Sequence, residues 1–174
     1  MKNLIFIGIT MVLFLSSCSQ KPRYTQNSTE IETLKAAISN YEAGNWEAFS
    51  KHFADTVKIY TNSENNHLSI QQAVSNEKEN LIPFSSYKFK ASSSEFEMVV
   101  TDKGETWVNF WGVWQGILIA NNQQVDVPIH MTLQFVDGKI VEEHDYFDNT
   151  PVLTALQKIE SASNEANQEL SIEN

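Results

Sequence analysis

The sequence predicts one α+β domain in which helices come first and a curved antiparallel sheet follows. Three observations lead to this prediction. Apolar residues recur at helical spacing as far as Leu81. From Tyr87 to Phe147 the pattern changes to the alternation of strands, and Asp137-Gly138 is a strong hairpin signal within it. Helices kept apart from an antiparallel sheet define the α+β class.

Three helices are predicted in the first half of the chain. The first has apolar residues three or four positions apart on one face: Ile31, Leu34, Ile38 and Tyr41. Ser28 or Thr29 can cap its start. Asn45 can cap a second, short helix, and Ser69 can cap a third that runs to about Leu81.

The remaining segments predict strands and a last helix. One strand, "TVKIYT", precedes the third helix, and the segments "YKFKA" and "EFEMVV" follow it. A long run over residues 105–119 contains Gly112 and Gly116, which predict bends or bulges. Two further strands flank the Asp137-Gly138 turn, and Thr150-Pro151 begins a short C-terminal helix.

Residues 1–17 predict a lipoprotein signal peptide. Lys2 precedes an apolar run of twelve residues, which is too short to cross a bilayer because a helical span needs about 20. The segment "LSSC" resembles the lipobox of bacterial lipoproteins, which implies that Cys18 carries lipid after cleavage. We therefore expect an exported protein anchored to a membrane, the outer membrane facing the periplasm if the host has two membranes.

Composition defines the other segments and excludes some partners. Residues 18–29 predict a polar tether, residues 30–160 the domain, and residues 161–174 a disordered acidic tail. The formal net charge is −10 and no basic cluster occurs, so we expect no nucleic-acid partner. Cys18 is the only cysteine, which excludes an internal disulfide or a cysteine-built metal site. No cofactor is predicted.

The order of these segments is similar to that of a known superfamily. A helix, then "YEAGNWEAFSKHFADTVKIY", another helix, and a sheet ending in "DGKIVEEHDYFD" resemble the nuclear transport factor 2-like superfamily, and within it the SnoaL-like branch that includes polyketide cyclases. The resemblance implies a cone-shaped fold: three N-terminal helices packed in a strongly curved mixed or antiparallel sheet, with a pocket at the open end. It implies no single function, because the superfamily holds isomerases, dehydratases, cyclases and non-catalytic binding modules.

The chemistry of one member, ketosteroid isomerase, does not fit this sequence. That enzyme uses a tyrosine, an aspartate base and a protonated aspartate. Carried over along the resemblance, these positions fall on Ala37, Thr61 and about Met131. None of these side chains can perform the roles of those groups, so the isomerase chemistry is excluded.

The two-residue loop at Asp137-Gly138 predicts a register in which opposed residues have numbers that sum to 275. The buried side then carries apolar residues of both strands: Ile129, Met131, Leu133, Phe135 and Ile140. Glu142, His144 and Tyr146 project from the same side into the pocket. A shift of one residue would exchange the two faces.

Glu142 and His144 are the candidate catalytic pair, because titratable groups on an apolar face have shifted pKa values and are enriched in functional sites. The alternative is a buried pair with a purely structural role. The candidate pocket residues are Met131, Tyr146, Ile129 and Asp148, although Asp148 suits a helix cap better. Glu142, His144 and Asp148 are possible metal ligands, but their spacing is no chelating motif and we predict no metal.

An alternative pair, His130 and Asp145, is opposed on the other side of the hairpin. SnoaL-like cyclases are described with a His and an Asp in their sites, but the predicted register turns this pair away from the pocket. Trp107 and Trp111 also fall on the face opposite the core. An exposed apolar patch marks an association site, so we predict a homodimer.

Two functions are compatible with these observations. The first is binding of a small apolar molecule in the pocket without chemistry. The second is a general acid-base enzyme of the isomerase, cyclase or dehydratase type, in which Glu142 and His144 handle protons and Tyr146 positions the substrate.

Overall fold

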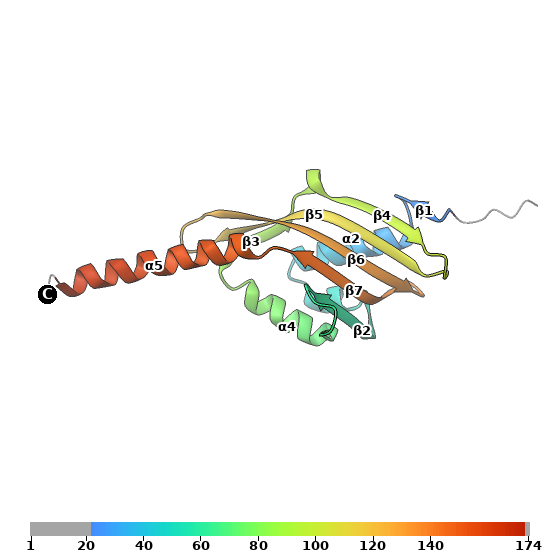
Figure 1. Ribbon diagram of the computed structural model, residues 1–174, viewed down its shortest axis with the longest axis horizontal. Coiled ribbons are helices and arrows are strands. Elements are labelled where there is room, and N and C mark those ends of the chain that lie inside the picture. Colours follow the sequence, from blue (N-terminus) through green and yellow to red (C-terminus); the bar gives the residue numbers. More distant parts are fainter. Residues whose placement is uncertain (1–21, 173–174) are drawn as a thin grey trace, which may run out of the picture.

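A computed structural model describes residues 22–172, so the predicted signal peptide and Cys18 lie outside the described residues. Helices α2 (Thr29–Glu42), α3 (Trp46–Ser50) and α4 (Ile70–Asn80) precede most of the sheet, and α5 (Thr150–Ile172) ends the chain. In Figure 1, α2 and α4 lie on one side of the curved sheet and α5 projects from the end of β7. The predicted α+β fold is confirmed.

Within residues 22–172, seven strands form one mixed sheet. They are β1 (Tyr24–Thr25), β2 (Phe53–Thr61), β3 (Phe84–Phe89), β4 (Glu95–Val100), β5 (Thr106–Leu118), β6 (Gln124–Val136) and β7 (Lys139–Phe147), with a 3₁₀ turn, η1 (Ala91–Ser93), before β4. The strand order is β1-β4-β5-β6-β7-β2, and β3 also pairs with β5. All pairs are antiparallel except β2 with β7, which makes the sheet mixed.

The predicted caps begin the three N-terminal helices. Ser28 Oγ accepts a hydrogen bond from the Ile31 amide at 3.2 Å, and Asn45 caps α3 in the same way. Ser69 and Gln72 form a reciprocal capping box at the start of α4. Each cap satisfies amide groups that the helix leaves unpaired, a contribution of about 1 kcal/mol.

Of the bends or bulges predicted at Gly112 and Gly116, the bulges do not form in the pairing of β5 with β6. β5 pairs with β6 in continuous register through both glycines. A Cβ at Gly112 would collide with the ring of Phe110, and one at Gly116 with the ring of Trp114. The glycines therefore leave room for an aromatic side chain two residues earlier to lie across the strand.

Two apolar clusters fill the space between the sheet and the helices. The first contains the most deeply buried side chains: Ile31, Val108, Phe110, Leu133 and Ile140. The second joins β3, β5 and β6 to α5 through Phe84, Trp114, Leu118, Val127, Val152 and Ala155. The C-terminal helix is thus held by the sheet through its first turns.

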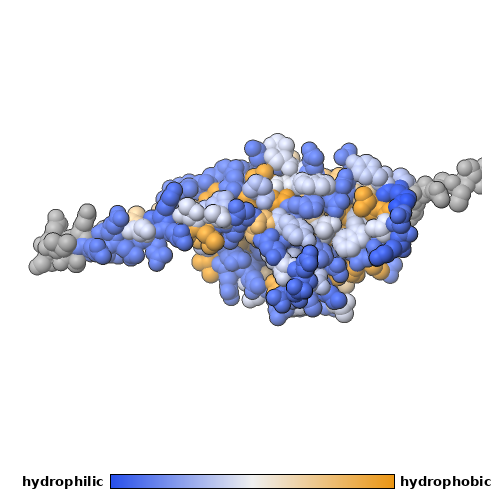
Figure 2. Space-filling model, in the orientation of Figure 1, coloured by the Kyte–Doolittle hydropathy of each residue, from blue (hydrophilic) through white to orange (hydrophobic). Residues whose placement is uncertain are grey.

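The packed part of α5 is short. Asp148 Oδ1 accepts a hydrogen bond from the Thr150 amide at 2.9 Å, and the last residue that packs against the second cluster is Ile159. The backbone stays helical to Ile172, through a region predicted as a disordered acidic tail. The side chains described beyond Ile159 are all exposed, and Figure 2 shows this projecting segment as largely hydrophilic.

No helix within residues 22–172 combines the length and the apolar character needed to span a membrane.

The hairpin between β6 and β7 has the predicted turn but a different register. Asp137 and Gly138 have φ values of 49° and 76°, as a type I′ turn requires. Val136 opposes Lys139 and Phe135 opposes Ile140, as predicted. The register then shifts by one residue between Gln134 and Phe135, which leaves Val141 as the extra residue of a bulge. From there to the end of β7 the opposed numbers sum to 276, for example Ile129 with Phe147, so the two faces are exchanged.

The positions of two apolar residues on β7 explain this bulge. Ile140 is fully buried in the first cluster, and Phe147 packs against the second. Their numbers differ by seven, an odd number, so a regular strand would send them to opposite faces. One inserted residue lets both side chains reach the core.

Candidate functional site

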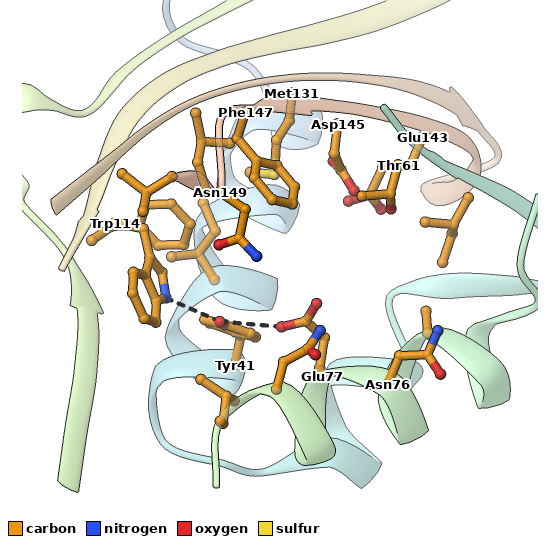
Figure 3. A pocket seen from close by; sticks show the side chains of 18 of the residues that line it. Tyr41, Thr61, Asn76, Glu77, Trp114, Met131, Glu143, Asp145, Phe147 and Asn149 are labelled. Carbon is orange, nitrogen blue, oxygen red and sulfur yellow. Dashed lines mark hydrogen bonds between the residues drawn. The ribbon is translucent and has the colours of Figure 1, made fainter. Parts of the chain in front are cut away.

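A cavity of about 490 Å³ lies between the inner face of the sheet and the helices (Figure 3). Helices α2, α3, α4 and α5 and strands β2, β3, β5, β6 and β7 all contribute side chains to its wall. Most of these are apolar, including Leu34, Phe49, Ile59, Val127 and Leu156. The volume is within the range of roughly 300–1,000 Å³ that is usual for small-molecule sites.

Two carboxyl groups from β7, Glu143 and Asp145, face this cavity and are called the carboxyl pair below. The bulge at Val141 turns them inward, opposite Leu133 and Met131 of β6. Glu143 is only 9% exposed. With both groups ionised, Glu143 Oε2 and Asp145 Oδ1 have no hydrogen-bond donor among the described residues. A shared proton or a donor from a ligand would satisfy these oxygens.

Burial changes the proton affinity of the carboxyl pair. It raises the pKa of Asp145 to about 7, against the opposing effect of hydrogen bonds that include one from the Thr61 side chain. Burial also raises the pKa of Glu143 well above its usual value, and the neighbouring Asp145 charge raises that pKa further. Two carboxyl groups in one apolar site share protons in this way because both cannot ionise at low cost. At neutral pH the carboxyl pair therefore retains at least one proton.

A second polar group, formed by Tyr41, Glu77 and Trp114, lies across the cavity (Figure 3). The Trp114 indole N–H donates to the Tyr41 oxygen at 3.1 Å, and the Tyr41 hydroxyl donates to Glu77 Oε2 at 3.4 Å. Burial raises the pKa of Glu77, and burial together with the Glu77 charge raises the pKa of Tyr41 well above its usual value. Tyr41 lies one helical turn after Ala37, where the isomerase resemblance had placed a tyrosine position.

The predicted catalytic pair lies outside the cavity. His144 Nε2 is 2.9 Å from Glu142 Oε1, so the two side chains do meet as expected. However, they project from the opposite face of β7, where the His144 ring stacks on Tyr60 with centroids 4.6 Å apart. Tyr146 shares this outer face and is 44% exposed. The prediction that these three side chains face the pocket was wrong because the bulge reverses the strand.

The alternative pair is not formed either. His130 opposes Tyr146 instead of Asp145, and it stacks on Trp111 of the outer face with centroids 4.9 Å apart. Of these two residues, Asp145 lines the cavity and His130 does not. His130 and Asp145 therefore lie on opposite faces of the sheet.

Of the four predicted pocket residues, Met131 and Ile129 line the cavity, whereas Tyr146 and Asp148 do not. Asp148 caps α5, and its hydrogen bonds from Thr150 lower the pKa of its carboxyl group. Among residues 22–172, no group of three or more His, Cys, Asp or Glu side chains is arranged to hold a metal ion.

Comparisons with solved structures show the fold. A candidate SnoaL-like polyketide cyclase from Jannaschia sp. CCS1 is 19% identical, with a TM-score of 0.59 over 78% of this chain and 96% of that one. IdmH from Streptomyces antibioticus, a candidate polyketide cyclase, is 14% identical, with a TM-score of 0.60 over 75% and 99% of the two chains. AclR from Streptomyces galilaeus, a candidate hydroxylase, is 18% identical, with a TM-score of 0.58 over 74% and 96%. No curated protein matches the chain.

The family follows from the sequence itself. The model of the SnoaL-like polyketide cyclase family matches residues 31–156, which include most of α2, the whole sheet from β2 onward and the first turns of α5. Both groups of polar side chains in the cavity fall within this match. The chain therefore belongs to the SnoaL-like polyketide cyclase family, and its domain has the nuclear transport factor 2-like fold.

Proposed function

We propose that the protein binds a small, largely apolar molecule in the cavity between the sheet and the helices. The observation that carries the proposal is the wall of this cavity, which is mostly apolar and onto which the carboxyl pair and the Tyr41–Glu77–Trp114 group converge. An apolar pocket with a few convergent polar groups is the usual form of a small-molecule site. Its apolar wall supplies affinity, and the polar groups orient the ligand.

Filling the cavity tests this proposal. Ala73 of α4 lines the cavity, whereas Ala36 of α2 is exposed, so Ala73→Phe and Ala36→Phe add the same side chain inside and outside it. With 4-phenylbutan-1-ol as a neutral apolar probe, calorimetry should show binding to the wild type and to Ala36→Phe. Ala73→Phe should bind at least tenfold more weakly, about 1.4 kcal/mol. Equal affinity in both variants would place the binding elsewhere, and circular dichroism would verify that each variant is folded.

A second candidate function is general acid-base catalysis by the carboxyl pair. The observation that favours it is the pKa of Asp145, which burial raises to about 7, a value suited to proton transfer at neutral pH. Glu143 and Asp145 then replace Glu142 and His144 in the proton-handling role. If Asp145 abstracts protons next to a carbonyl, the protein should accelerate deuterium uptake by a cyclic ketone in heavy water, and Asp145→Asn should lose roughly two to four orders of magnitude of that rate.

We further propose that the protein is exported and held at a membrane by lipid on Cys18, on the outer membrane facing the periplasm in a host with two membranes. The "LSSC" segment after the apolar run supports this location. We also propose a homodimer that pairs through the outer face of the sheet. Trp111 and Tyr146 are 41% and 44% exposed there, and large exposed aromatic side chains are typical of association surfaces.

A further inference from the structure

We infer that the ligand of the cavity is an organic cation, an apolar body that carries an amine, with the ammonium group held between Glu77 and the carboxyl pair. The inference rests on the proposed function and names the chemical class of its ligand. It starts from the charges in the wall of the cavity, which are all of one sign.

Four acidic residues line the cavity, and no basic residue of the described chain does. The acids are Glu77 and Glu79 of α4 together with the carboxyl pair of β7, and the lining contains no lysine, arginine or histidine. A buried carboxylate is costly unless a cation or several hydrogen-bond donors compensate for it. His144 is adjacent in sequence to both members of the pair, but it projects to the other face and contacts Glu142. A cation from outside the chain would supply the missing charge.

The carboxyl pair also has buried acceptor atoms that, without a ligand, only a shared proton can satisfy. With both groups ionised, Glu143 Oε2 and Asp145 Oδ1 are buried without a donor among the described residues. The Glu143 residue as a whole is more than nine-tenths buried. Residues two apart on a strand lie roughly 6.5–7 Å apart on one face, so a single group between them can reach both side chains. An ammonium group offers three donors and no acceptor, which suits a carboxyl pair that has lost its shared proton and has only acceptor atoms left.

Glu77 completes the site from the helical side. Its charge raises the pKa values of both Glu143 and Asp145, so the three carboxyl groups lie within electrostatic reach of one another. Figure 3 shows Glu77 on α4 facing the strand that carries the pair. A cation between them would relieve this mutual repulsion, whereas a carboxylate or phosphate ligand would increase it.

Aromatic side chains around the cavity suit the same ligand. Trp114, Tyr41 and Phe147 contribute rings to the wall, and a ring face attracts a cation more strongly when water is excluded. The aliphatic side chains of β6 and α5 can then cover the apolar body. The cavity can therefore bind both the ammonium group and the apolar body of a hydrophobic amine.

The proposal predicts that binding depends on pH, because the amine competes with the protons of the carboxyl pair. Glu77 of α4 acts on both members of the pair, and His144 acts on Asp145 from the outer face. Glu79 of α4 and Tyr41 of α2 line the same cavity. The parts of β2, β5, β6 and α5 that line the cavity contribute no charged group. Since burial raises the pKa of Asp145 to about 7, amine affinity should increase from pH 6 to pH 8. The affinity of a neutral ligand should increase less.

Three probes with the same apolar body test the inference by calorimetry at pH 8: 4-phenylbutylamine, 4-phenylbutan-1-ol and 4-phenylbutanoate. The amine is protonated at this pH, as a lysine side chain is. We expect it to bind at least tenfold more tightly than the alcohol, about 1.4 kcal/mol, and the carboxylate to bind least. Equal affinity of amine and alcohol, or preference for the carboxylate, would overturn the inference and leave the proposed function standing. If none of the three binds, the proposed function fails as well.

Substitutions on β7 then test which side chains bind the ammonium group. Asp145→Asn and Glu143→Gln should each weaken the amine about tenfold or more, while the affinity for the alcohol changes by less than about threefold. Glu142→Gln is the matched control, because its carboxyl group lies on the outer face of the same strand. If one variant does not fold, the other and the pH dependence of the wild type still decide the question. If Glu142→Gln weakened the affinity for the amine by the same factor, the ammonium group would not lie beside Glu143 and Asp145.

Discussion

Replacing Asp145 with asparagine should make the protein more stable at high pH and should flatten the dependence of its stability on pH. The reason is the pKa of Asp145, which burial raises from an ordinary 3.8 to about 7 in the folded protein. Between these values the folded state binds more protons than the unfolded state. The contribution of Asp145 to the free energy of unfolding therefore decreases as pH rises from about 4 to about 7 and is constant above that.

The size of this effect follows from the same two values. One group contributes at most about 1.4 kcal/mol per pH unit, so over the interval between pH 3.8 and about 7 the contribution of Asp145 changes by about 4 kcal/mol in total. Asp145→Asn removes this cost of burying a charge and weakens the hydrogen bond from Thr61, because an amide oxygen is a weaker acceptor than a carboxylate, a loss of about 1 kcal/mol. We expect the variant to be about 1–3 kcal/mol more stable than the wild type at pH 8, and no more stable at pH 4.

Urea unfolding followed by circular dichroism between pH 4 and pH 8.5 measures both proteins under the same conditions. Glu142→Gln serves as the control, because it removes a carboxyl group from the outer face of the same strand, where the side chain is 31% exposed. The reasoning would be refuted if Asp145→Asn had the same slope as the wild type, or if it were the less stable protein by the same amount at every pH.

Three further predictions concern the outer face and the anchor. His144→Gln should leave the affinity for 4-phenylbutan-1-ol within about twofold, because the ring lies outside the cavity; a tenfold loss in the same titration would place it inside. The domain should sediment as a dimer, and Trp111→Asp should give monomers because a carboxylate in an apolar interface costs several kcal/mol; a wild-type monomer at tens of micromolar would exclude the dimer. Cys18→Ser should abolish membrane retention and leave the fold intact, and labelled fatty acid incorporated at wild-type levels would argue against the lipobox.

Most of the fold could be predicted from the sequence because it depends on local signals. Ser28, Asn45 and Ser69 cap the helices at the predicted positions, and the Asp137-Gly138 turn has the predicted conformation. Such features involve residues a few positions apart, so their physical causes are visible in short segments. The parallel pairing of β2 with β7 joins segments about 80 residues apart and has no local signal of this kind.

The face of β7 that lines the cavity was predicted wrongly because a single residue decides it. The 275 register holds for the first two pairs after the turn, and the bulge at Val141 then reverses every later side chain. A signal was present, since Ile140 and Phe147 are both large and apolar but an odd number of residues apart. Giving weight to the burial of Phe147 would have predicted the bulge, and with it Glu143 and Asp145 in the pocket.

The group around Tyr41 could not be predicted in the same way. Tyr41 was correctly placed on the inner face of the first helix, but its partners come from α4 and β5. Glu77 does share a helix face with Ala73, Val74 and Leu81, but nothing in the sequence of α4 indicates that Tyr41 or Trp114 lies opposite that face. Their meeting depends on how the helices pack against the sheet, which the spacing of residues within one segment does not specify.

The most direct test of the account is a crystal structure of the protein with 4-phenylbutylamine at a saturating concentration. We predict density for the phenyl group between α2, α4 and the sheet, with the nitrogen about 3 Å from an oxygen of Glu143 or Asp145. An empty cavity at saturation, or the amine bound on the outer face beside His144, would contradict the account.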